Sequence, residues 1–198
     1  DAEGAPVEIE AESPILPERR FPLRRTRAKV AVDGDLREWG KLAFAVDEPG
    51  ETLGPGRHDG PDDASFRFDA RWDPEALFVA VDVRDDSIVA GSDRSLRQQD
   101  CVTLSVDARP DPERSENHDL FATVGSGAMA KIVSVLATLD GVRPDRTTAL
   151  FDGTAAEGVR WAARRTPGGY AVEISIPNAL LDERRGARWD AVRLNLTV

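Results

Sequence analysis

Tryptophan is the side chain in this sequence best suited to hold a ligand by stacking. The 198-residue chain has four, Trp39, Trp72, Trp161 and Trp189, beside one Tyr and seven Phe. The apolar C–H face of a sugar ring stacks on an aromatic plane, while its hydroxyls pair with charged or amide side chains. These residue types are therefore compatible with sugar recognition, and their positions decide which of them can contribute.

Two of these tryptophans are candidates for an exposed stacking surface. Trp189 stands in the polar segment 186–190 and is out of phase with the inward-facing residues of the strand that follows it. Trp72 has the parity of a core residue, but it is the last strand residue before a turn, where a side chain can reach a cleft. Trp39 and Trp161 are predicted to lie in the core.

Charged and amide side chains on outward strand faces are the predicted polar partners of such a surface. Sugar hydroxyls need donors and acceptors on planar side chains, which Arg, Glu and Asn supply. The predicted partners of the two tryptophans are Arg71, Arg84, Glu173 and Asn195.

The sequence contains no motif that would make catalysis the first hypothesis. It has no Gly-rich phosphate loop, nucleophile elbow or His-Glu-x-x-His helix. A carboxylate pair for glycoside hydrolysis needs a defined separation across a cleft, which a sequence does not show. We therefore predict a binding protein that is not an enzyme.

Charge and composition narrow the range of partners. The chain has 36 acidic and 26 basic residues, a net charge of −10. An acidic chain is disfavoured as a partner of nucleic acid or of anionic membrane surfaces. No apolar run approaches the length that spans a bilayer, so membrane insertion is not expected. Cys101 is the only cysteine, which excludes an internal disulfide.

Period-two alternation of apolar and polar residues is the main structural signal. It indicates antiparallel strands with one buried and one wet face. Many short strands without a long helix predict an all-β fold, an antiparallel two-sheet β-sandwich of jelly-roll or immunoglobulin-like architecture. The alternating runs are 64–72, 77–84, 102–107, 170–176 and 192–198.

The remaining segments suggest how the domain is delimited. Residues 1–27 carry four prolines among mixed charges and are interpreted as a linker or a surface-draped extension. Residues 28–198 form the predicted sandwich, which we expect to be truncated because the chain stops on a strand. Residues 177–181 are expected to form only a short helical turn, with Pro at its start.

Four segments, taken in order, resemble a known family. They are 32–39 (VDGDLREW), 71–86 (RWDPEALFVAVDVRDD), 99–107 (QDCVTLSVD) and 169–177 (GYAVEISIP). In this order they resemble the family 9 carbohydrate-binding modules and their relatives in the DOMON-like group of β-sandwiches. The resemblance runs from about Lys29 to the C-terminus.

The resemblance implies a non-catalytic carbohydrate-binding module within a larger secreted or envelope protein. Family members clamp the end of a sugar chain between two tryptophan planes, with polar side chains beneath, and Trp72 and Trp189 are the two candidate planes here. The family often carries Glu where this chain has Thr103, which puts a polar contact from that strand in doubt. The alternative is a structural or protein-interaction sandwich that has lost the sugar site.

Two cofactors follow from the same resemblance. Calcium, which prefers several oxygen ligands, would be held in a structural role by Asp85, Asp86 and Asp100. Haem, which some DOMON-like relatives bind between Met and His or Lys, would make the chain an electron-transfer domain. Haem is the less favoured alternative, and its candidate ligands are Met129, Lys131, His118 and His58.

Overall fold

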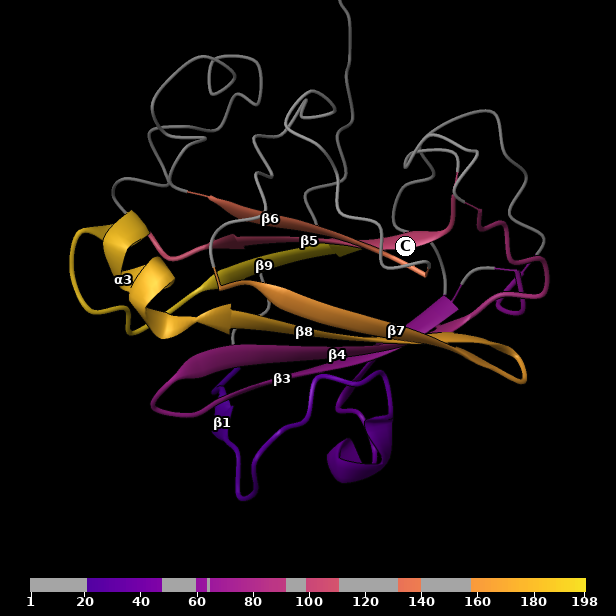
Figure 1. Ribbon diagram of the computed structural model, residues 1–198, viewed down its shortest axis with the longest axis horizontal. Coiled ribbons are helices and arrows are strands. Elements are labelled where there is room, and N and C mark those ends of the chain that lie inside the picture. The colour runs from indigo at the N-terminus through magenta and orange to yellow at the C-terminus, as the bar shows by residue number, and fades with distance from the viewer. Residues whose placement is uncertain (1–20, 48–59, 64, 92–98, 111–131, 140–157) are drawn as a thin grey trace, which may run out of the picture.

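The structure is a two-layer β-sandwich with a further covering on one side (Figure 1). The computed structural model describes residues 21–47, 60–63, 65–91, 99–110, 132–139 and 158–198. A large sheet and a small sheet lie face to face, and all strand pairs but one are antiparallel. The predicted all-β, two-sheet sandwich is confirmed.

The large sheet has six strands in the order β1-β3-β4-β8-β7, with β2 also paired to β3. The two-residue strand β1 runs parallel to β3, and it comes from the segment interpreted as a linker or surface extension. Strands β2 and β7 were not among the strands predicted from alternation. The strands are β1 (Arg24–Arg25), β2 (Phe44–Val46), β3 (Ser65–Trp72), β4 (Ala76–Arg84), β7 (Arg160–Thr166) and β8 (Gly169–Pro177).

The small sheet has three strands in the order β6-β5-β9. They are β5 (Cys101–Asp107), β6 (Val133–Thr138) and β9 (Arg193–Thr197). Strand β6 was not among the predicted runs. The core between the sheets is built from the inward-facing parity of each strand, which burial of apolar surface stabilises. It includes Val79, Val81, Leu104, Val172 and Ile174.

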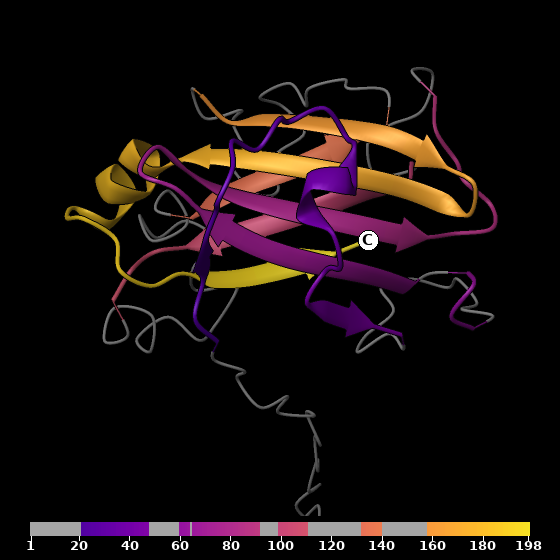
Figure 2. The same cartoon turned by 90° about the horizontal axis from the view of Figure 1, so that it is seen from below.

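The outer face of the large sheet is not wet, contrary to the prediction from alternation. Residues 30–42 cross this face, as Figure 2 shows from below, and they include the 3-10 helix η1 (Leu36–Trp39). A second apolar cluster therefore forms on the side of the large sheet that faces away from the small one. Its buried members are Val30, Trp39, Leu42, Ala76, Phe78 and Ala80.

The helix after β8 is longer than the predicted turn. It is α3 (Asn178–Arg185), which buries Leu180 and Leu181 at one end of the sandwich. Gly186 ends it in the left-handed conformation, with φ 76°, where glycine carries no steric penalty. In the part of the chain that the structure describes, no helix is long and apolar enough to cross a membrane.

Candidate functional site

The two candidate tryptophans meet at the end of the sandwich where α3 lies (Figure 1, left). Trp72 is the last residue of β3, and Trp189 lies between α3 and β9. Their ring centroids are 6.4 Å apart with an interplanar angle of 80°, an edge-to-face contact. Both side chains are half-buried. We call Trp72 and Trp189 the tryptophan pair.

Helix α3 and its C-terminal turn hold Trp189 in place. The backbone N–H of Trp189 donates to Oδ1 of Asp182 at 2.7 Å, and the indole Nε1 donates to Oδ1 of Asn178 at 3.2 Å. The side-chain Nδ2 of Asn178 donates in turn to the backbone carbonyl of Asp73 at 2.8 Å. The turn after β3 and the first turn of α3 are thereby tied together beside the tryptophan pair.

Arg25 is a charged side chain that contacts the Trp72 ring. Its guanidinium carbon lies 5.8 Å from the centre of the Trp72 ring, within the range of a cation–π interaction. The parallel pairing of β1 sets Arg25 opposite Trp72, and the N–H of Thr26 donates to the Trp72 carbonyl at 2.9 Å. Arg25 was missed because it lies in a basic, proline-containing segment, and only strand pairing brings it to this site.

Glu173 lies on the covered face of the large sheet and is buried, with 1% of its surface exposed. Its Oε2 accepts from the backbone N–H of Asp33 at 3.0 Å and of Gly34 at 2.8 Å, and its Oε1 accepts from Nε1 of Trp39 at 2.7 Å. The predicted outward direction is correct, but the expected solvated face is wrong because residues 30–42 cover it. Glu173 therefore anchors the covering segment to β8.

The protonation of Glu173 reflects the balance between burial and these donors. Burial raises the pKa of its carboxyl above the usual value, while the hydrogen bonds from Trp39, Asp33 and Gly34 oppose the rise. Three N–H groups directed at one carboxylate leave it little capacity for a ligand. Its observed role is to fasten the Asp-Gly turn and the Trp39 indole.

Arg71 lies on the same covered face as Glu173. Its guanidinium donates to the Trp39 carbonyl at 2.6 Å and to Oδ2 of Asp69 at 3.0 Å. It also stacks over the Trp39 ring, with 4.7 Å between the guanidinium carbon and the ring centre. Arg71 and Trp72 are neighbours in β3, but alternation places their side chains on opposite faces of the sheet.

Arg84 and Asn195 lie apart from the tryptophan pair. Arg84 ends β4 at the other end of the large sheet and forms an exposed 3.1 Å ion pair with Asp62. Asn195 is exposed on β9, opposite Ser105 of β5. Of the six predicted carbohydrate-binding residues, the fold brings together Trp72 and Trp189 in one place, and Arg71 and Glu173 around Trp39 in another.

Two of the three predicted calcium ligands lie near each other. Burial is the main cause that raises the pKa of the Asp100 carboxyl, and the adjacent Asp85 carboxylate adds to the rise. Asp86 is exposed. Within the described ranges, no group of three or more His, Cys, Asp or Glu side chains could hold a metal ion. Met129, Lys131, His118 and His58, the candidate haem ligands, lie outside the described residues.

A solved structure with a TM-score above 0.5 supports the fold. The chain is similar to a carbohydrate-binding module family 9 from Caldicellulosiruptor kristjanssonii in complex with glucose, with a TM-score of 0.56 at 14% identity over 90% of this chain and 76% of that chain. A second structure, of a family 9 module from the same organism with cellotriose, gives a TM-score of 0.49 at 16% identity over 78% of this chain and 66% of that one.

Comparison of sequences supplies the family. None of the curated proteins compared with the chain matches it. The sequence profile described as "Carbohydrate family 9 binding domain-like" matches residues 55–189, which is more than half of the 198 residues. With the two-sheet sandwich already described, this match means that the chain belongs to the family 9 carbohydrate-binding domain-like proteins.

Proposed function

We propose that this chain is a non-catalytic carbohydrate-binding module that holds a sugar at the tryptophan pair. The observation that carries the proposal is the meeting of two half-buried indoles from distant parts of the sequence at one end of the sandwich. Family membership supports it, as does the relative of similar fold that is described in complex with glucose. By the same analogy, the module belongs to a larger secreted or envelope protein.

The edge-to-face geometry favours binding of a sugar to one indole face at a time. Two indoles at 80° do not form parallel walls, so a ring can stack on the face of only one of them while the other flanks it. A single stacking face predicts weaker binding than a two-sided clamp gives. The Nε1 of Trp189 is already bonded to Asn178, so the sugar's hydrogen bonds would come from exposed side chains nearby.

The second candidate function is a structural or protein-interaction sandwich without a sugar site. The observation that favours it is that part of each indole is already covered. Trp189 packs against the main core, and the Arg25 guanidinium lies over the Trp72 ring. A partner protein would then bind an exposed surface of the sandwich.

We also propose that the carboxylates of Asp85 and Asp100 bind a calcium ion. Carboxylate oxygens are its preferred protein ligands, and a divalent cation would offset the repulsion between two neighbouring carboxylates. Two carboxylates alone do not complete its usual six to eight oxygen ligands. Backbone carbonyls and water would supply the others, and the role would be to fasten the segment that follows β4 to the segment that precedes β5.

A tryptophan-fluorescence titration with soluble gluco-, xylo- and manno-oligosaccharides tests the sugar proposal. We expect a saturable change for at least one sugar in the parent chain. Trp189→Ala and Trp72→Ala should each lose it, because each removes one of the two aromatic contacts. Trp161→Phe is the matched control, since Trp161 packs against the core from β7 and should leave the response intact.

Each variant must retain the fold, as judged by circular dichroism and thermal melting. A flat response of the folded parent chain to every sugar, with calcium supplied, would contradict the sugar proposal and favour the protein-interaction alternative. A response that survives both alanine substitutions would place the sugar elsewhere on the sandwich.

A further inference from the structure

We infer that the ligand of the tryptophan pair is an acidic sugar, a uronic acid residue whose carboxylate pairs with Arg25. The inference rests on the proposed function and specifies its substrate class. Arg25 is exposed, and its guanidinium lies 5.8 Å above the Trp72 ring, so this cation borders the indole that a sugar would use. The group presented to solvent here is thus an aromatic face with a positive charge over it.

The backbone fixes the position of Arg25. Strand β1 pairs in parallel with the end of β3, with Arg24 opposite Arg71 and Arg25 opposite Trp72. The hydrogen bond from the N–H of Thr26 to the Trp72 carbonyl, at 2.9 Å, closes this pairing on the far side of Arg25. A ligand-binding group on paired backbone is pre-organised, which reduces the entropy lost on binding.

Arg25 differs from the neighbouring arginines in its partners. Arg24 and Arg71 both donate to the buried carboxylate of Asp69, each at 3.0 Å. Within the described residues Arg25 has no carboxylate partner, and its guanidinium contacts the Trp72 ring. Its charge is therefore available to an anionic ligand.

Three acidic residues near the tryptophan pair, Asp73, Asp182 and Asp190, already have partners. Asp182 accepts from the backbone N–H of Trp189, and Asp190 is paired with Arg185. Oδ1 of Asp73 accepts from the backbone N–H groups of Glu75 and Ala76, at 2.8 Å each. The net charge of −10 is a property of the whole chain, and these bonds reduce the repulsion that a bound carboxylate would meet at this site.

A neutral sugar and an acidic sugar would meet Arg25 differently. A neutral ring that stacks on the same face of Trp72 must displace the guanidinium and lose its interaction with the indole. A carboxylate can pair with the planar guanidinium while the guanidinium stays over the ring. Charge-assisted pairing of this kind is stronger than a neutral hydrogen bond, so the site favours the acidic ligand.

The test compares a galacturonic acid trimer with its methyl ester, in which each carboxylate is replaced by a neutral ester group. We measure the affinity of the parent chain for both by calorimetry at neutral pH. Loss of a charge-assisted pair predicts roughly tenfold weaker binding of the ester. Binding of the acid should also weaken as salt is added, because the ion pair is at the surface.

Variants at Arg25 test whether its charge causes the preference for the acid over the ester. Arg25→Gln should bring the two affinities to within about twofold of each other, because the charge that distinguishes the probes is gone. Arg27 is an exposed arginine in the same segment, two residues after Arg25. Arg27→Gln should therefore leave the preference for the acid unchanged. Arg25→Lys retains the charge without the planar fork and should fall between them.

The outcomes separate this inference from the proposed function. If the ester and neutral oligosaccharides bind the parent chain as tightly as the acid, the acidic-sugar inference is overturned and the sugar module stands. If neither the trimers nor the neutral panel bind folded protein, both fail. The comparison of probes uses the parent chain, so it remains decisive even if a substitution at Arg25 detaches β1.

Discussion

Glu173 shows how one buried carboxylate can order a distant segment. It lies in β8, yet its three acceptor bonds go to Asp33, Gly34 and Trp39 in the segment that crosses the large sheet. The Asp-Gly turn gives it two consecutive backbone donors, and the indole supplies a third. A carboxylate is suited to this position because both of its oxygens only accept.

Replacing Glu173 by Gln should destabilise the protein by about 1–3 kcal/mol, because the new amide nitrogen places a donor against a donor. Urea denaturation followed by circular dichroism measures the change in the free energy of unfolding. Glu183→Gln, on the exposed side of α3, is the matched control and should have little effect. Equal stability of the two variants would contradict the role of Glu173 as an anchor of the covering segment.

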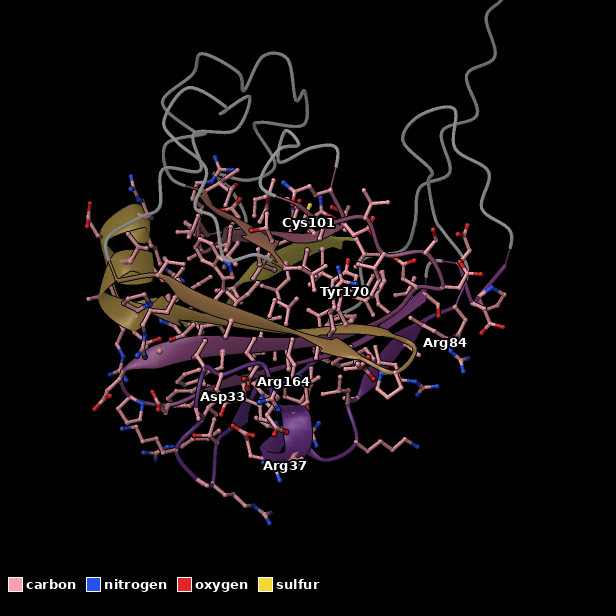
Figure 3. The ribbon with its side chains drawn as sticks, turned by 45° about the vertical axis from the view of Figure 1, so that its right-hand side comes forward. Asp33, Arg37, Arg84, Cys101, Arg164 and Tyr170 are labelled. Atoms are coloured by element: carbon pink, nitrogen blue, oxygen red, sulfur yellow. The ribbon has the colours of Figure 1, made fainter. Side chains whose placement is uncertain are left out.

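Tyr170 is the only tyrosine of the chain, so its ionisation reports on burial between the two sheets. Figure 3 shows it below Cys101, within the sandwich, and it is 1% exposed. Burial, with smaller contributions from Asp100, Cys101 and Asp85, raises its pKa well above the ordinary value of about 10. The raised pKa favours the neutral phenol in the folded state.

The stability linked to Tyr170 is therefore fully present below pH of about 10 and is lost as the pH rises towards the folded-state pKa. In an alkaline titration, tyrosinate absorbance should stay absent until the protein unfolds and then appear together with the loss of circular dichroism. Absorbance that titrates smoothly with an ordinary pKa, while the circular dichroism is intact, would show that Tyr170 is accessible to solvent.

At the scale of elements, alternation predicted the central strands well because side-chain direction is a local property of an extended chain. It missed β6, and it missed β2 and β7 as well. Strand β7 (Arg160–Thr166) shows the reason: with arginines on both faces and no wholly buried residue, it owes its place to pairing with β8. Edge strands of this kind have a weak apolar signal.

The β7–β8 hairpin depends on a glycine whose backbone is unusual. Gly169 has φ +151°, and a Cβ there would lie 1.9 Å from the carbonyl oxygen of Val83 in the adjacent strand. Gly169→Ala should cost about 3 kcal/mol, since either β8 or β4 must move. Gly168→Ala is the matched control, because a Cβ at Gly168 meets nothing within 4 Å.

The two glycine variants should differ clearly in thermal melting temperature. Gly168→Ala is expected to melt close to the parent chain, and Gly169→Ala well below it. Similar melting of both would mean that the end of β4 can shift without loss of pairing.

At the scale of the whole molecule, the fold has three layers: the small sheet, the large sheet and the segment 30–42. The large sheet is consequently buried on both faces near its centre, where Leu77, Val79 and Val81 point to one core and Phe78 and Ala80 to the other. The tryptophan pair occupies one end of the sandwich and Asp85 with Asp100 the other.

The proposed calcium at Asp85 and Asp100 predicts a global stabilisation on binding. Free calcium at about a hundredfold excess over its dissociation constant would add about 2.7 kcal/mol to the free energy of unfolding. Melting should therefore shift to lower temperature when a chelator is added, and Asp85→Asn should reduce the shift. An unchanged transition in chelator would contradict the calcium proposal.

The sequence by itself determined the all-β class, the inward parity of the central strands, the core position of Trp39 and the family. These depend on local alternation and on ordered motifs within the chain. Only the tertiary structure decided that Trp72 meets Trp189, that Arg25 lies over Trp72, and that Glu173 is covered. Each of these contacts joins residues far apart in sequence, and strand pairing and layer packing, which set them, leave no periodic signal along the chain.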